Sequence, residues 1–179
     1  SMLAMSFLNE AMAGMEQVQA GELLNRLRHK VAHALQKEDP TGDEHDKMEV
    51  ALCVWDIHSH QIQYSGAQRP LYFFRQGEFT ELLPDDISIA RETPLERSFH
   101  TRVIDLKAQD MIYLFTRGVY EQQGQNQQEE MGLERLKKLL FDVHHLPVDQ
   151  QKEKVSEYWE NWKDERPQGA DVLLMGMRF

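Results

Sequence analysis

The sequence predicts an α+β domain in which antiparallel sheets are flanked by helices. Two observations indicate this class. Apolar residues recur with a helical period at both ends of the chain and in short β-rich runs in its middle. The predicted strands are also grouped together instead of alternating with helices. With 179 residues, of which 41% are apolar, the chain is expected to form a single domain over residues 1–179.

The first part of the chain predicts two helices. Residues Met2–Ala13 are good helix formers and are apolar on nearly every side, which is typical of a buried helix. No capping residue precedes them, so we expect the chain to begin within an element, with further material upstream. After Gly14–Gly21 a second, amphipathic helix is expected, with Asn25, Arg28 and Lys30 away from its apolar face. That face consists of Leu24, Leu27, Val31 and Leu35.

The middle of the chain predicts strands. Residues Glu38–Asp46 have the composition of a solvated loop. Short runs rich in β-branched and aromatic residues follow, separated by turn signals at His58–His60 and Gln76–Gly77. The runs expected to form an antiparallel meander are Val50–Trp55, Gln61–Ser65, Pro70–Phe74 and Glu78–Leu82. Two further strands, Thr101–Leu106 and Met111–Phe115, are separated by four residues and predict a hairpin.

The last part of the chain predicts two helices and a terminal strand. The helices are expected over Leu133–Val143 and Val148–Lys163, and the strand over Asp171–Phe179. The second helix carries four large apolar or aromatic residues at helical spacing, which favours packing in a core over an exposed recognition patch. These residues are Val155, Tyr158, Trp159 and Trp162.

Charge and composition exclude several classes of function. Thirty acidic residues against 20 Lys and Arg give a formal charge of −10, which disfavours nucleic acid as a partner. No run approaches the roughly 18 apolar residues that a membrane span needs, and no signal peptide precedes the first helix. We therefore expect a cytoplasmic protein. The single cysteine, Cys53, lies in an apolar run and is expected to be a small buried hydrophobe.

Five segments, taken in chain order, resemble one known family. They are Ser6–Glu10, Met48–Asp56, Tyr64–Tyr72, Tyr113–Gly118 and Gln168–Gly176. The third, Tyr-Ser-Gly-Ala-Gln-Arg-Pro-Leu-Tyr, is similar to the pattern Tyr-x-Gly-Ala-x-x-Pro-Leu-Tyr of the stage II sporulation protein E type of PPM (2C-class) Ser/Thr protein phosphatase domain. The resemblance extends from about Leu3 to the last residue, essentially the whole chain.

This resemblance implies an α-β-β-α sandwich with a binuclear Mn or Mg site. In such enzymes carboxylates hold two divalent ions that activate a water for attack on phosphoserine or phosphothreonine. The family's Asp-Gly-x-Gly-His-Gly turn, which supplies metal ligands, would lie before Ser1. The resemblance therefore implies an N-terminally incomplete domain that lacks this turn and its N-terminal strands.

The positions that match the family's metal site carry different chemistry. Where the family has Ser-Asp-Gly, this chain has Thr-Arg-Gly, so that Arg117 replaces a metal-binding Asp before Gly118. In the family's Asp-Asp pair, Ala170 replaces the ligand and Asp171 remains, while Glu49 stands at a strand start where the family often has Asp. A guanidinium has no lone pair to donate. It repels a like charge about 4 Å away by roughly 4 kcal/mol per unit charge at an effective dielectric near 20.

These replacements predict a pseudophosphatase, a bacterial signalling domain that acts by binding another protein. No catalytic residue and no cofactor is assigned, and Asp171 and Glu49 are weak candidates for metal ligands. The hypothesis pairs Arg117 with Asp171 or Glu49 in an ion-free site. The resemblance implies a partner similar to an anti-sigma-factor antagonist, a phosphoprotein, or an upstream sensor domain.

Three alternatives stay open. A register slip of one or two residues would leave a ligand near position 117. The chain could belong to an active Mn- or Mg-dependent phosphatase whose remaining ligands lie upstream. It could also be the dimerisation module of a sensor, and hence a homodimer.

Overall fold

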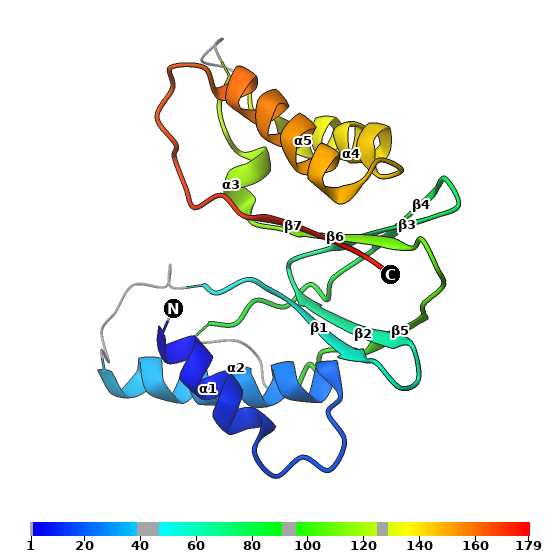
Figure 1. The fold of residues 1–179 in the computed structure, drawn as a ribbon. Coiled ribbons are helices and arrows are strands. Elements are labelled where there is room, and N and C mark those ends of the chain that lie inside the picture. The colour runs from blue at the N-terminus through cyan, green and yellow to red at the C-terminus, as the bar shows by residue number, and fades with distance from the viewer. Residues whose placement is uncertain (1, 39–46, 91–95, 125–128) are drawn as a thin grey trace. The chain divides into compact units, whose positions relative to one another are not determined.

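The computed structural model describes residues 2–38, 47–90, 96–124 and 129–179, and its helices and strands form two compact units (Figure 1). The first unit comprises Ser1–Leu71 and Leu82–Lys107, and the second comprises Tyr72–Glu81 and Ala108–Phe179. Each unit has its own antiparallel sheet and its own pair of longer helices. The predicted combination of helices and antiparallel sheets is therefore confirmed. Most of the predicted loop Glu38–Asp46 lies outside the described residues.

The first unit places a helix on a three-stranded sheet. Its elements are α1 (Met2–Met12), α2 (Ala20–Glu38), β1 (Val50–Asp56), β2 (Gln61–Ala67) and β5 (Arg102–Asp105). The strand order is β1-β2-β5. The β1–β2 hairpin pairs Val50 with Ala67 at one end and Asp56 with Gln61 at the other. In the predicted turn, the Asp56 carboxylate accepts hydrogen bonds from His58 N at 2.9 Å and Ser59 Oγ at 2.8 Å.

The core of the first unit lies between α2 and the sheet. Helix α2 packs on β1 and β2, and its predicted apolar face is confirmed because Leu24, Leu27 and Val31 are buried there. Arg28, by contrast, was expected on the polar side and is buried. Its guanidinium lies 5.3 Å from the centre of the Phe99 ring, where the ring face stabilises a cation.

Helix α1 is not the buried helix that its composition predicts. Among the residues from Met5 to Met12, only Ala11 is buried, with Phe7 and Leu8 half-buried against the core, while Met5 is 67% exposed. One stripe of the helix is enough to attach it, so the remaining apolar side chains stay exposed. Cys53 is partly buried in β1, and desolvation raises the pKa of its thiol to about 12.

The second unit has a four-stranded sheet, two longer helices and a third helix of about one turn. Its strands are β3 (Leu71–Arg75), β4 (Glu78–Leu82), β6 (Met111–Phe115) and β7 (Leu174–Arg178), in the order β4-β3-β6-β7. Its helices are α3 (Arg117–Tyr120), α4 (Gly132–Val143) and α5 (Val148–Lys163). No helix in the described ranges is both long and apolar enough to span a membrane.

The core of the second unit is aromatic. Tyr72, Phe74 and Tyr113 of the sheet are buried with Leu140 and Trp159 of the helices. The expected core role of Trp159 and Trp162 is confirmed, and their indole nitrogens donate to Val119 O at 3.2 Å and Gln122 O at 2.9 Å. Tyr158 was expected on the same face but is 39% exposed. Tyr158 lies beside Glu157, which is also exposed, on the outer side of α5.

The predicted strands exist, but two predicted pairings are wrong. The strands Thr101–Leu106 and Met111–Phe115 do not form a hairpin, because β5 pairs with β2 in the first sheet while β6 pairs with β3 and β7 in the second. The predicted four-strand meander is likewise divided, with β1 and β2 in one sheet and β3 and β4 in the other. A short connection is compatible with a hairpin, but it does not require one.

Candidate functional site

The candidate site lies in the second unit, where two segments distant in sequence meet. Thr116, which follows β6, donates its hydroxyl to Asp171 O at 2.8 Å. The same hydroxyl oxygen accepts a hydrogen bond from Leu173 N at 2.8 Å, and Thr116 N donates to Leu173 O at 2.9 Å. Three hydrogen bonds thus attach the start of α3 to the segment that leads into β7.

Gly118 brings these segments into backbone contact. A methyl group at this position would collide with the carbonyl of Asp171 and would lie 3.0 Å from Ala170 O. Only a glycine fits this approach without a shift of the neighbouring backbone. The four positions predicted from the sequence in this unit, Arg117, Gly118, Ala170 and Asp171, are therefore brought together.

The partner of Arg117 is neither Asp171 nor Glu49, the two that were expected. Its side chain is 56% exposed, and its Nε lies 3.1 Å from Glu121 Oε2. The two residues are four apart along the chain at α3, which places them on one side of the helical turn. Sequence reasoning missed Glu121 because it did not predict α3, although an Arg-x-x-x-Glu spacing is itself a signal for such a pair.

Glu49, the fifth predicted position, belongs to the first unit and has a partner there. Its Oε2 lies 2.5 Å from Arg69 Nη2, and the arginine side chain is buried while that of Glu49 is 30% exposed. The carbonyl of Arg69 in turn accepts a hydrogen bond from the buried hydroxyl of Tyr64. This ion pair thus joins the start of β1 to the connection between β2 and β3.

A pocket of about 430 Å³ opens beside Arg117. Its lining carries two arginines and two glutamates, so that its formal charge is zero in a chain of charge −10. These side chains are Arg117, Glu121, Glu130 and Arg166. Gln122 links the two segments that line the pocket, 117–123 and 166–170. Its amide nitrogen donates to Gln123 O in the first and to Pro167 O in the second, each at 3.2 Å. Ala170 contributes a methyl group to the same lining.

The side chains at this site do not fit a binuclear metal centre. Two hard dications need several oxygen ligands to neutralise them. The positions offer the carboxylate of Asp171, a methyl group at Ala170 and a guanidinium at Arg117. Over the described parts of the chain, no three His, Cys, Asp or Glu side chains are arranged to hold a metal ion.

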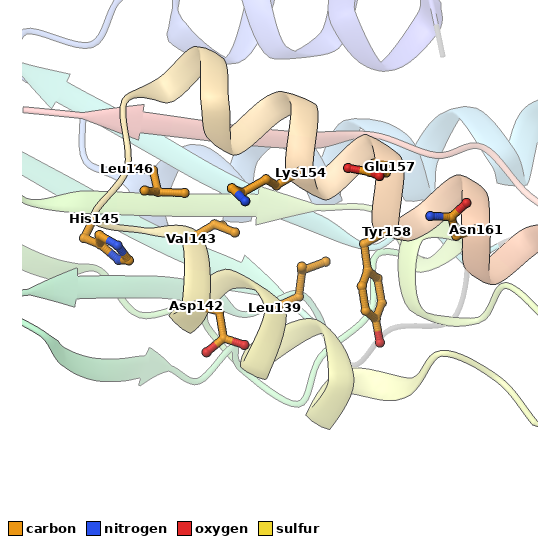
Figure 2. Close-up of a pocket in the computed structure, with 9 residues that line it drawn as sticks. All are labelled: Leu139, Asp142, Val143, His145, Leu146, Lys154, Glu157, Tyr158 and Asn161. Carbon is orange, nitrogen blue, oxygen red and sulfur yellow. The ribbon is translucent and has the colours of Figure 1, made fainter.

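A second pocket, of about 490 Å³, lies between the outer sides of α4 and α5 (Figure 2). Leu139 and Val143 of α4 line it together with Lys154, Glu157 and Tyr158 of α5. Helical spacing predicts Tyr158 in the core, so nothing in the sequence indicates this pocket. Acidic, basic and apolar side chains alternate around it, so its lining does not indicate one class of ligand.

Comparisons with known proteins identify the relatives of this chain. Residues 1–179 match the model of the family described as stage II sporulation protein E (SpoIIE). Among curated proteins, none matches the chain.

Solved structures share the fold. The SiaA-PP2C domain of Pseudomonas aeruginosa is 21% identical with a TM-score of 0.84, and the match covers 99% of this chain and 68% of that one. The phosphatase domain of the cell fate determinant SpoIIE from Bacillus subtilis, presoaked with Mn, is 12% identical with a TM-score of 0.59 over 99% and 74% of the two chains.

A third solved structure contains the RsbU and RsbW domains of Rv1364c from Mycobacterium tuberculosis. It is 18% identical to this chain with a TM-score of 0.67, over 98% of this chain and 45% of that one. At these identities the three likenesses show the fold, which is that of PP2C-type phosphatase domains.

Proposed function

The chain belongs to the stage II sporulation protein E family, and we propose that it is a phosphatase-like signalling domain that binds another protein instead of hydrolysing a phosphoester. One observation carries the proposal. At the meeting point of Gly118 and Asp171, where the resemblance places metal ligands, the chain carries the cation of Arg117 and the methyl group of Ala170.

The electrostatic reason is quantitative. A dication about 4 Å from a guanidinium is repelled by roughly 8 kcal/mol at an effective dielectric near 20. Glu121 offsets one unit of charge and Asp171 supplies one carboxylate. Neither replaces the set of ligands that two neighbouring dications require.

The proposed partner is a protein similar to an anti-sigma-factor antagonist, or a sensor domain of the same polypeptide. The M. tuberculosis structure supports a partner domain within one polypeptide, because its RsbU domain and its RsbW domain belong to the same protein. The proposed setting is the bacterial cytoplasm, which agrees with the charge of −10 and the composition.

Metal uptake and hydrolysis test the proposal. We expect the wild-type chain to show neither heat of Mn binding in calorimetry nor Mn-dependent hydrolysis of p-nitrophenyl phosphate. The double variant Arg117→Asp/Ala170→Asp is expected to bind Mn, with each single variant binding less, since each change restores one carboxylate. Mn-dependent hydrolysis by the wild-type chain would contradict the proposal.

Protein binding is tested by affinity capture from the native bacterium. Arg117→Ala should lose the partner that the wild-type chain retains. Arg26→Ala is the matched control, because Arg26 forms the same kind of exposed pair, with Glu22 at 2.9 Å, in the first unit. A partner that Arg117→Ala retains at full yield would count against a binding face at this pocket.

An active Mn- or Mg-dependent phosphatase is the second candidate. The shared fold with a Mn-presoaked phosphatase domain favours it. It predicts Mn-dependent hydrolysis by the longest native chain, and that activity should disappear on chelation.

A further inference from the structure

An aspartate and a histidine form a pair in the first unit, on the segment that precedes β5. The Asp85 carboxylate accepts two hydrogen bonds from His100, one from the backbone N and one from the ring Nδ1, each at 2.8 Å. Because a carboxylate only accepts hydrogen bonds, Nδ1 carries the proton of the neutral ring. The free lone pair of that ring is therefore on Nε2.

Asp85 is itself held in place. Its backbone N donates to Gly66 O at 2.9 Å, and its backbone carbonyl accepts a hydrogen bond from Gln68 N at 3.2 Å. The side chain of Asp85 is 11% exposed, whereas that of His100 is 76% exposed. A fixed and largely buried carboxylate thus orients an exposed imidazole.

The contact with the ring contributes more to reactivity than to stability. An exposed pair of this kind adds little to the free energy of unfolding. The two ring nitrogens are separated by one carbon, so the bond at Nδ1 turns Nε2 away from the carboxylate. Within the described part of the chain, Nε2 of His100 forms no hydrogen bond. The carboxylate of Asp85 also stabilises the positive charge that the ring gains when Nε2 forms a new bond.

The surroundings of His100 indicate the class of reactant. His100 lines neither the pocket beside α3 nor the pocket between α4 and α5, so a small transferred group fits this position better than a substrate that must be enclosed. Among the described residues, no acid contacts Nε2 that could protonate a leaving group. A phosphoramidate needs no such acid, because its nitrogen is already protonated near neutral pH.

We propose that His100 accepts a phosphoryl group on Nε2 from a donor of the phosphoramidate class. The lone pair of Nε2 attacks phosphorus and forms a new N–P bond, while the P–N bond of the donor breaks. The amine leaves as a neutral molecule, because it takes the electrons of that bond and was protonated before the attack. The ring keeps its proton on Nδ1, becomes cationic and stays hydrogen-bonded to Asp85. This site is independent of metal binding at Gly118.

His58 is a matched control within the same chain. Its backbone N donates to the Asp56 carboxylate at 2.9 Å, as that of His100 donates to Asp85, and the residue is exposed. Its ring forms no hydrogen bond with the described residues. The two histidines therefore differ in the ring contact on which the proposed reaction depends.

The reaction is tested on the full chain with potassium phosphoramidate and, separately, with a peptide that carries one phosphohistidine. Mass spectrometry measures the phosphoryl group on each of the eight histidines, and its loss at acid pH identifies the N–P linkage. We expect His100 to react at least about tenfold faster than His58. Transfer from either donor supports the site, and the faster donor shows whether a small molecule or a protein supplies the group. Equal rates at the two histidines would overturn the proposal.

The variant Asp85→Asn tests the positioning role of the carboxylate. The rate at His100 should fall at least about fivefold, and part of the phosphoryl group should appear on Nδ1, because that nitrogen is no longer held as a donor to a carboxylate. Phosphorus NMR distinguishes the two ring positions, and a merely structural aspartate would not alter their ratio. His100→Gln should remove the signal while the circular dichroism spectrum stays that of the wild type. Phosphorylation of Nε2 alone at an unchanged rate in Asp85→Asn would also overturn the proposal.

Discussion

Two glycines of this chain lie where backbone segments approach most closely, but their surroundings differ. A methyl group at Gly66 would lie 2.5 Å from Arg69 O and would collide with the buried hydroxyl of Tyr64. One at Gly118 would collide with the carbonyl of Asp171, in an exposed segment. Near Gly66 the Tyr64 hydroxyl donates to Arg69 O and the Arg69 guanidinium pairs with Glu49, whereas the residue before Gly118 is an exposed arginine.

This difference shows that a chain can keep the glycines of a family pattern while the residues beside them differ. Gly66 and Gly118 both match the family pattern, and both are required by the backbone whatever the chemistry. The side chains of Arg117 and Ala170 take no part in these approaches, so other side chains at the two positions are compatible with the fold. The region around Gly66 thus pairs a close approach with buried groups, while the region around Gly118 pairs one with an exposed cation.

The largest effect is expected from Gly66→Ala. Its methyl group would overlap two fixed groups in the buried end of β2, so the free energy of unfolding should fall by about 3 kcal/mol. Urea unfolding followed by tryptophan fluorescence measures this. Gly169→Ala is the control and should change the free energy by less than about 0.5 kcal/mol, because the added methyl meets no atom. Equal values for the two variants would contradict the close approach at Gly66.

Gly118→Ala is expected to have a smaller effect, about 2 kcal/mol. The backbone at Ala170 and Asp171 is exposed and precedes β7, so that it can shift by a few tenths of an ångström to relieve the overlap. The measurement is the same unfolding experiment. A loss larger than that of Gly66→Ala would mean that the exposed segment is the more rigid of the two.

Thr116→Val should reduce stability by about 1 kcal/mol. The substitution keeps the side-chain shape but removes the hydroxyl that bonds Asp171 O and Leu173 N. Thr80→Val, at an exposed position of β4, controls for the change of residue type. If both variants were equally stable, the hydroxyl would not hold the two segments together.

Arg117→Ala should have the smallest effect on stability, below about 0.5 kcal/mol, since it removes one exposed ion pair. Arg26→Ala removes the comparable pair with Glu22 and also a weak contact of Arg26 with Ala11 O at 3.4 Å, so its loss should be equal or slightly larger. A loss above about 1 kcal/mol at position 117 alone would assign a structural role to this guanidinium and remove the contrast between the two regions.

Much of the fold could be predicted because local patterns are strong. The apolar stripe Leu24–Leu27–Val31 identified α2, and the aromatic spacing in α5 placed Trp159 in a core. Helix α3 was missed because four residues that contain a glycine have no helical period. Arg28 was misplaced because a charged side chain is ordinarily exposed, and only an aromatic partner such as Phe99 makes its burial favourable.

The sequence by itself determined the periods of the elements and the sign of the charge at position 117, because both are properties of the chain and need no partner. The tertiary structure decided that β5 and β6 belong to different sheets, that Arg69 pairs with Glu49, and that Glu121 is the partner of Arg117. The physical reason is that every residue type except proline offers the same backbone donor and acceptor, and a guanidinium can pair with any carboxylate within reach. A strand or an arginine therefore finds its partner through the packing of distant segments, which no local pattern records.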